Sequence, residues 1–214
     1  MRSHFEEQLA LLNKELIEMG ALCEEVIELA SRALTEGNKS LAAQIAPIDA
    51  QIDQKERTIE AMCLRLLLQQ QPVAKDLRQI SAALKMITDM ERIGDQAEDI
   101  AEIICFLKEE ERKEDVLLSE MAKASISMVT ESVDAFVKRD IILAEKVIKD
   151  DDIVDRYFDR VKEDLIRKIA ENPKNGEYAI DLLIIAKYYE RIADHAVNIA
   201  KWVIFSVTGV HKEE

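Results

Sequence analysis

The chain has 214 residues, of which 43 are acidic and 29 basic, and its formal net charge is −14. Five glycines and three prolines in a sequence that is 48% hydrophobic are typical of long helices, and they argue against a β-sheet protein or a disordered chain. An acidic surface gains no affinity by releasing counterions from phosphates, so we expect no nucleic-acid partner. Basic protein surfaces and metal cations are the partners that this charge favours.

The sequence predicts a cytoplasmic protein that is not inserted in a membrane. Its N-terminal residues lack the apolar segment of a signal peptide, and no apolar run approaches the roughly 20 residues that span a bilayer. Cys23, Cys63 and Cys105 are odd in number, widely spaced and set in apolar helical patterns. We therefore expect three reduced thiols in the core.

Three helices are predicted in the first half of the chain. Apolar residues from Phe5 to Ala33 recur at alternating steps of four and three, and Gly37-Asn38 ends this helix. A second helix carries the same rhythm from Leu41 to Leu66, with Pro47 expected to kink it or mark a restart, and it ends before Pro72. The third runs from about 73 to 110.

The second half repeats this order. Helices are expected over 116–138, from 141 to a turn at 172–176, and over 177–207, and the charged stretch 108–115 is expected to separate the halves. The sequence thus predicts an all-α fold of two tandem, pseudo-symmetric three-helix bundles. Their expected ranges are 1–110 and 111–214.

A sequence repeat supports this duplication. The third and sixth helices share Glu-Arg-Ile-x-Asp-x-Ala-x-x-Ile-Ala, beginning at Glu91 and at Glu190, which gives an offset of 99 residues. The second and fifth helices align at an offset of 102, which pairs Asp49 with Asp151 and Asp53 with Asp155. The agreement of motif, order and flanking acids indicates one unit used twice.

Each unit carries two carboxylate pairs at i, i+4 spacing, which a helix places on one face. The acids of the third and sixth helices fall opposite the apolar stripe, so we expect them on an outer face or a groove rim. Two pairs from neighbouring helices can bridge hard cations, and all-oxygen ligands argue against a catalytic zinc site and favour Mg, Mn, Ca or iron. The bland alternative is a solvated acidic face. The candidate ligands are Asp49, Asp53, Glu91, Asp95, Asp151, Asp155, Glu190 and Asp194.

At these residues the chain resembles the PhoU family of phosphate-uptake regulators, over essentially its whole length. The resemblance implies metal binding (Fe, Zn, Mn or Mg) by the Glu-x-x-x-Asp motifs, with Glu91, Asp95, Glu190 and Asp194 as ligands. It also implies a negative regulator of the phosphate regulon and of Pst phosphate uptake. The implied partners are the transporter ATPase and a sensor histidine kinase, at the membrane but not inserted in it. Family members are often homodimers.

The two copies differ at the ends of their motifs. Asn198 and Lys201 replace Asp99 and Glu102, so we expect the first copy to be the better metal site. Two other functions compete with a regulatory adaptor. A ferritin-like di-metal enzyme needs Glu-x-x-His, which none of the three histidines provides, and no phosphate-binding or nucleophile motif is present, so we expect no enzyme. A purely structural helical scaffold is the remaining alternative.

Overall fold

The computed structural model describes residues 2–69, 73–107 and 116–211, and these form six long helices, one short helix and a 3-10 turn. No strand occurs in these three ranges, and the prediction of an all-α fold is confirmed. The expected boundary between residues 110 and 111, and the charged stretch 108–115, lie outside the described residues.

The first half forms α1 (Arg2–Glu36), the short α2 (Lys39–Ala42), α3 (Ile45–Gln69) and α4 (Ala74–Phe106). The side chain of Asn38 caps α2 by accepting hydrogen bonds from the amides of Ser40 and Leu41. Pro47 lies in the first turn of α3, where a helix loses nothing by its missing N–H. Pro47 therefore marks a restart, and Leu41 belongs to α2 instead of the long second helix.

The second half forms α5 (Val116–Lys138), α6 (Ile141–Glu171), the 3-10 turn η2 (Pro173–Asn175) and α7 (Gly176–Thr208). The turn between α5 and α6 repeats the one that follows α1. Gly37 and Arg139 both have a left-handed φ, of 65° and 56°, and the next residue in each case donates its amide at 2.9 Å to a carbonyl of the preceding helix. These two turns are 102 residues apart, as the duplication predicts.

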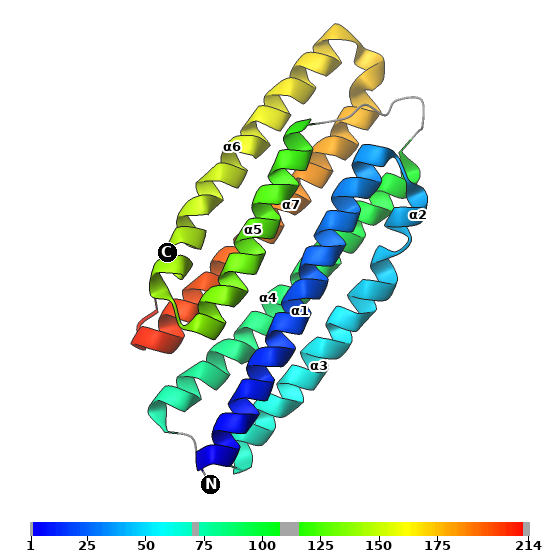
Figure 1. The fold of residues 1–214 in the computed structure, drawn as a ribbon. Helices are drawn as coiled ribbons and strands as arrows, with labels where there is room; N and C mark the ends of the chain where they lie inside the picture. The colour runs from blue at the N-terminus through cyan, green and yellow to red at the C-terminus, as the bar shows by residue number, and fades with distance from the viewer. Residues whose placement is uncertain (1, 70–72, 108–115, 212–214) are drawn as a thin grey trace.

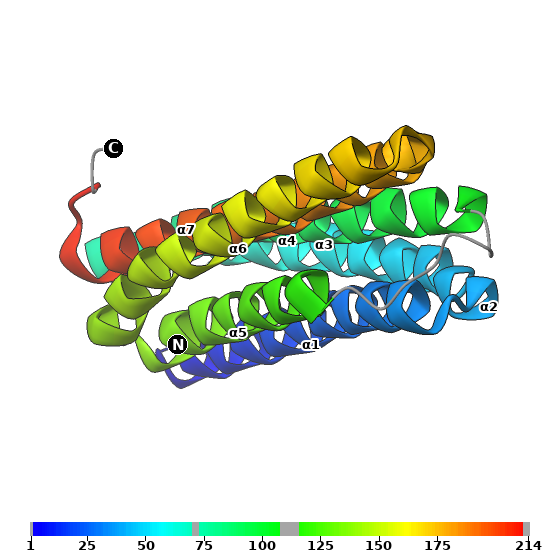
Figure 2. The same ribbon diagram turned by 90° about the horizontal axis from the view of Figure 1, so that it is seen from above.

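The helices pack in two layers (Figures 1 and 2). One layer runs in the order α3, α4, α7, α6, and the other consists of α1 and α5. The two halves meet where α4 lies against α7 and where α1 lies against α5. The helices that carry the repeated motif are therefore neighbours at the centre of the molecule, and α3 and α6 flank them.

A single hydrophobic core runs through both halves. The apolar stripes of α4 and α7 are fully buried, and Ile93 and Ile192 at the motif centres are 0% exposed. Cys23 and Cys63 are buried as predicted, whereas the prediction for Cys105 is wrong because its side chain is exposed. The preceding residue, Ile104, continues the buried stripe of α4, and Cys105 is turned away from it.

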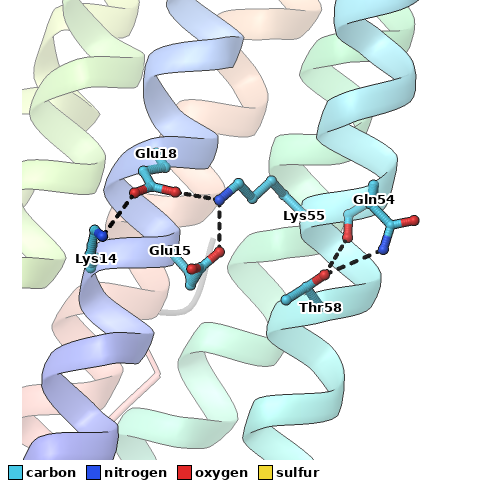
Figure 3. A network of polar contacts seen from close by, with 6 residues as sticks. All are labelled: Lys14, Glu15, Glu18, Gln54, Lys55 and Thr58. Atoms are coloured by element: carbon cyan, nitrogen blue, oxygen red, sulfur yellow. Dashed lines mark hydrogen bonds and ion pairs between the residues drawn. The ribbon is translucent and has the colours of Figure 1, made fainter.

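A polar network ties α1 to α3 away from the motif helices (Figure 3). The ammonium of Lys55 donates to Glu15 at 2.7 Å and also pairs with Glu18, and Lys14 lies 3.5 Å from Glu18. Lys55 is a quarter exposed, so its charge is partly shielded from water and paired twice. This network fixes how α3 lies along α1, and α3 in turn places Asp49 and Asp53 beside α4.

Candidate metal centres

The structure brings the eight predicted carboxylates together in two groups, one for each half of the chain. In the first half, the charges of Asp53, Asp95 and Glu91 all act on Asp49. In the second half, the charges of Asp155, Asp194 and Glu190 all act on Asp151. The two helix pairs α3–α4 and α6–α7 thus produce the same arrangement twice.

Asp49 lies deepest in the first group. Its side chain is only 8% exposed, and its Oδ1 is buried without a hydrogen-bond partner. Burial, followed by the charges of Glu98 and Asp53, raises the pKa of Asp49 to about 6. An unpartnered carboxylate oxygen among like charges is an arrangement that a cation stabilises.

Two further carboxylates belong to this first group. Glu98 is the strongest electrostatic neighbour of Asp49, and Glu56 is close enough to act on Glu91. Burial is the main cause that raises the pKa of both side chains, and neighbouring acids add to it. The sequence does contain a signal for each, because Glu98 lies three residues after Asp95 and Glu56 three residues after Asp53, on the same helix faces. The first cluster therefore consists of Asp49, Asp53, Glu56, Glu91, Asp95 and Glu98.

The second cluster consists of Asp151, Asp155, Glu190 and Asp194. Burial, followed by the charge of Asp155, raises the pKa of Asp151 to about 6, and its Oδ1 is buried without a partner, like that of Asp49. The offsets of 102 and 99 place Phe158 and Val197 where the first cluster has Glu56 and Glu98. The second cluster is thus a reduced copy of the first.

Basic side chains also distinguish the clusters. In the first, Arg92 contacts Asp95 at 2.8 Å and Glu91 at 3.4 Å, and Arg57 contacts Asp53 at 3.3 Å. In the second, Lys187 donates to Glu190 at 2.5 Å. These pairs lie at the rims, where an ion pair contributes little and a side chain can turn aside.

Both clusters offer carboxylate oxygens, which are the ligands that hard cations prefer. In each cluster one of these oxygens, Oδ1 of Asp49 or Oδ1 of Asp151, is buried without a hydrogen-bond partner. Within the residues that the structure describes, however, no group of three or more His, Cys, Asp or Glu side chains is arranged to hold a metal ion as it stands. The carboxylates are neighbours that need side-chain rotation to converge. The clusters are therefore sites of the right chemistry and not preorganised ligand cages.

Gly94 explains how Asp49 reaches its buried position. A Cβ at Gly94 would lie 2.3 Å from Oδ1 of Asp49 and 3.1 Å from Cδ1 of Ile52. The equivalent position in the second half is Ala193, which is fully buried. The first copy thus uses the missing side chain of a glycine to admit a carboxylate against α4.

The close approach of Asp49 to Gly94 leads to a testable prediction for Gly94→Ala. Alanine favours a helix over glycine by about 1 kcal/mol, but overpacking costs about 1–3 kcal/mol, so we expect a net loss in the free energy of unfolding. In an Asp49→Ala background the closer obstacle is gone and only Cδ1 of Ile52, at 3.1 Å, has to shift, so the same change should cost much less or stabilise by up to about 1 kcal/mol. Urea unfolding of the four proteins measures both effects. An equal effect of Gly94→Ala in both backgrounds would show that Asp49 is not the crowded group.

None of the described helices is long and apolar enough to cross a membrane. The family model of the PhoU domain matches the chain twice, over residues 16–104 and 118–203. These two matches include both clusters and most of each of the six long helices.

Relatives and solved structures match along nearly the whole chain. A Thermotoga maritima protein named "Phosphate-specific transport system accessory protein PhoU homolog 1" is 34% identical over 99% of this chain and 92% of its own length. An Aquifex aeolicus protein named "Phosphate-specific transport system accessory protein PhoU homolog" is 38% identical over 86% of this chain and 84% of its own length. The crystal structure of PhoU from Pseudomonas aeruginosa superposes with a TM-score of 0.90, at 36% identity, over 96% of this chain and all of that one. By sequence, by repeat and by fold, this chain belongs to the PhoU family.

Proposed function

We propose that this protein is a metal-binding regulatory adaptor of phosphate homeostasis, which restrains phosphate uptake and the phosphate regulon through contacts with other proteins. Relatives that match almost the whole chain are named accessory proteins of a phosphate-specific transport system. The observation that carries the proposal is the pair of carboxylate clusters, each with a buried aspartate oxygen that lacks a partner. A purely structural scaffold has no need to bury such groups twice at equivalent positions.

In this proposal, the first cluster holds its cation through Asp49, Asp53, Glu91 and Asp95, with Glu98 and Glu56 beside them. The second cluster uses Asp151, Asp155, Glu190 and Asp194. A bound cation supplies positive charge that removes the repulsion among the acids and gives a docking partner a fixed point to contact. Carboxylate ligands favour iron, manganese or magnesium, and zinc is the softer alternative.

The relatives' names refer to a phosphate-specific transport system, and the partners themselves are those that the family resemblance implies. We propose that the protein acts in the cytoplasm on the ATPase of a phosphate transporter and on a sensor histidine kinase, as a homodimer or a single chain. The face formed by α3, α4, α7 and α6 carries both clusters, so it is the face that we assign to these contacts. We assign no catalytic role to the clusters, and a di-metal enzyme remains the competing function.

A cellular experiment tests the regulatory role. Deletion of the gene is expected to raise phosphate uptake and secreted phosphatase in phosphate-rich medium, and the wild-type gene should restore repression. Asp95→Asn with Asp194→Asn should fail to restore it. Glu25→Gln with Glu28→Gln removes the same charge from α1 in the other layer and should restore it fully. An unchanged phosphate response in the deletion strain would reject the regulatory role.

A further inference from the structure

A recess of about 610 Å³ opens beside the second cluster, between α4, α6 and α7. Its lining mixes both signs of charge with neutral hydrogen-bonding groups. The polar side chains in it are Gln96, Asp151, Arg191, Asp194, His195, Asn198 and Lys201. It is thus a polar pocket that includes two carboxylates of the second cluster.

The basic groups of this recess are specific to the second half. At the offset of 99 residues, Lys201 stands where the first half has Glu102, and Asn198 stands where it has Asp99. Both halves have an arginine at the equivalent position, Arg92 and Arg191, but the two differ in their ion pairs. Arg92 contacts Asp95 at 2.8 Å, whereas neither Arg191 nor Lys201 forms an ion pair with any residue of the described ranges. Two cations therefore face the recess without a carboxylate partner.

A contact between the two halves of the chain orients the imidazole of His195 in the recess. Asp89 of α4 lies 2.9 Å from Nδ1 of His195, and the same carboxylate oxygen accepts from the amide of Asn198 at 3.2 Å. With Nδ1 engaged, Nε2 is the ring nitrogen that a ligand in the recess can contact. The first half places Gln96 at the position equivalent to His195, so this contact also has no counterpart there.

The recess also contains acceptors that lack donors. Oδ1 of Asp151 and Oε1 of Gln96 are buried and have no hydrogen-bond partner. A buried carboxylate oxygen of this kind is stabilised by a cation. The guanidinium of Arg191, which lies 5.7 Å from the centroid of the Tyr188 ring and has no carboxylate partner among the described residues, and the ammonium of Lys201 are stabilised by an anion. A ligand that satisfies both carries a metal ion and an oxyanion together.

We propose that this recess binds inorganic orthophosphate together with a metal ion. Asp151 and Asp194 contact the metal, and Arg191 and Lys201 contact the phosphate oxygens, with His195 at the side. This proposal rests on the metal binding proposed above for the second cluster. Without the cation, the two carboxylates offset the two basic groups, so phosphate binding requires the metal. The acidic first cluster holds metal alone.

Equilibrium dialysis with radiolabelled orthophosphate tests the proposal, using chelator-treated protein with and without Mn²⁺ and measuring bound manganese in the same samples. Wild-type protein should bind phosphate only when Mn²⁺ is present. Arg191→Gln with Lys201→Gln should weaken phosphate binding at least about tenfold, since each loses a charge-assisted hydrogen bond, and should not lower the amount of bound manganese. The control Lys75→Gln with Lys85→Gln removes the same charge from exposed positions of α4 and should change phosphate affinity less than about twofold.

The outcomes separate the two proposals. If manganese binds and phosphate does not, or if the Arg191 and Lys201 variant binds phosphate like the wild type, the oxyanion site is wrong and the metal sites stand. If no manganese binds, both proposals fall. A phosphoserine peptide that binds without displacement by orthophosphate would also overturn the proposal, because the pocket would then serve a modified protein and not the free ion.

Discussion

Removing carboxylates from the first cluster is expected to weaken metal binding far more than removing their equivalents from the second. The substitutions are Asp53→Asn, Glu91→Gln and Asp95→Asn in the first, and Asp155→Asn, Glu190→Gln and Asp194→Asn in the second. We expect the first set to lower the affinity for Mn²⁺ by at least about 100-fold, since the loss of mere outer-shell partners costs 10–100-fold. The second set should leave the tighter binding intact and abolish only the weaker.

The reason is the inequality of the two copies. Glu56 and Glu98 add negative charge to the first cluster, whereas Phe158 and Val197 occupy those positions in the second. Lys187 also competes for Glu190, and Lys201 brings a further positive charge to the second recess. Ligand charge is a main determinant of the affinity of carboxylate sites for hard cations. The difference in Mn²⁺ affinity between the two clusters should be largest when phosphate is absent.

Calorimetric titration of chelator-treated protein with Mn²⁺ measures both affinities. Thermal unfolding gives an independent reading, because a ligand at 100 times its Kd stabilises the folded state by about 2.7 kcal/mol, which raises Tm by about 5–10 °C in a chain of this size. The substitution of Glu25 and Glu28 by Gln, which removes two acidic charges from α1 against three in each set, is the control. Equal losses from both sets would show that the extra acids of the first cluster do not contribute.

The sequence predicted the helices and the repeat because both depend on local pattern. Apolar periodicity fixes which face of each helix is buried, and the two motifs place Ile93 and Ile192 in the core as expected. Gly37-Asn38 predicted a helix end that the structure shows, and the same turn recurs at Arg139-Asp140, where no glycine announces it. Order and duplication were therefore readable without any structure.

The depth of Asp49 was not readable from the sequence. Its burial depends on how closely α3 approaches α4, which tertiary packing determines, and on the space left by Gly94 forty-five residues further along the chain. The recess could not be predicted from the sequence either, because Gln96 and Asp89 of α4 lie beside the second cluster only as a result of the packing of α4 against α7. Local patterns describe one helix at a time, whereas these groups meet across two or three.

The burial of Asp49 and Asp151 is expected to make the metal-free protein less stable as pH rises, whereas aspartates in ion pairs have the opposite effect. An aspartate has a pKa near 3.9 in an unfolded chain, and Asp49 and Asp151 are raised to about 6 in the folded protein. The folded state therefore binds more protons than the unfolded state between these values, so the contribution of the two groups falls as pH rises from about 4 to 6 and is lowest above 6.

Replacing both residues by asparagine should remove this dependence. Each two-unit shift corresponds to at most about 2.7 kcal/mol, and partial access of water reduces this to about 1–2 kcal/mol per residue. In the presence of a chelator, Asp49→Asn with Asp151→Asn should thus be about 2–4 kcal/mol more stable than the wild type at pH 7.5, and about a third of this difference should remain at pH 4.5, which lies just above the pKa of an unfolded aspartate. Urea unfolding at both pH values measures this, with Glu25→Gln and Glu28→Gln as the control. Added Mn²⁺ should reverse the order at pH 7.5, because only the wild type retains the two buried carboxylates that a cation stabilises. A wild type that is the more stable protein at pH 7.5 without metal would show that these two aspartates are not strained in the folded state.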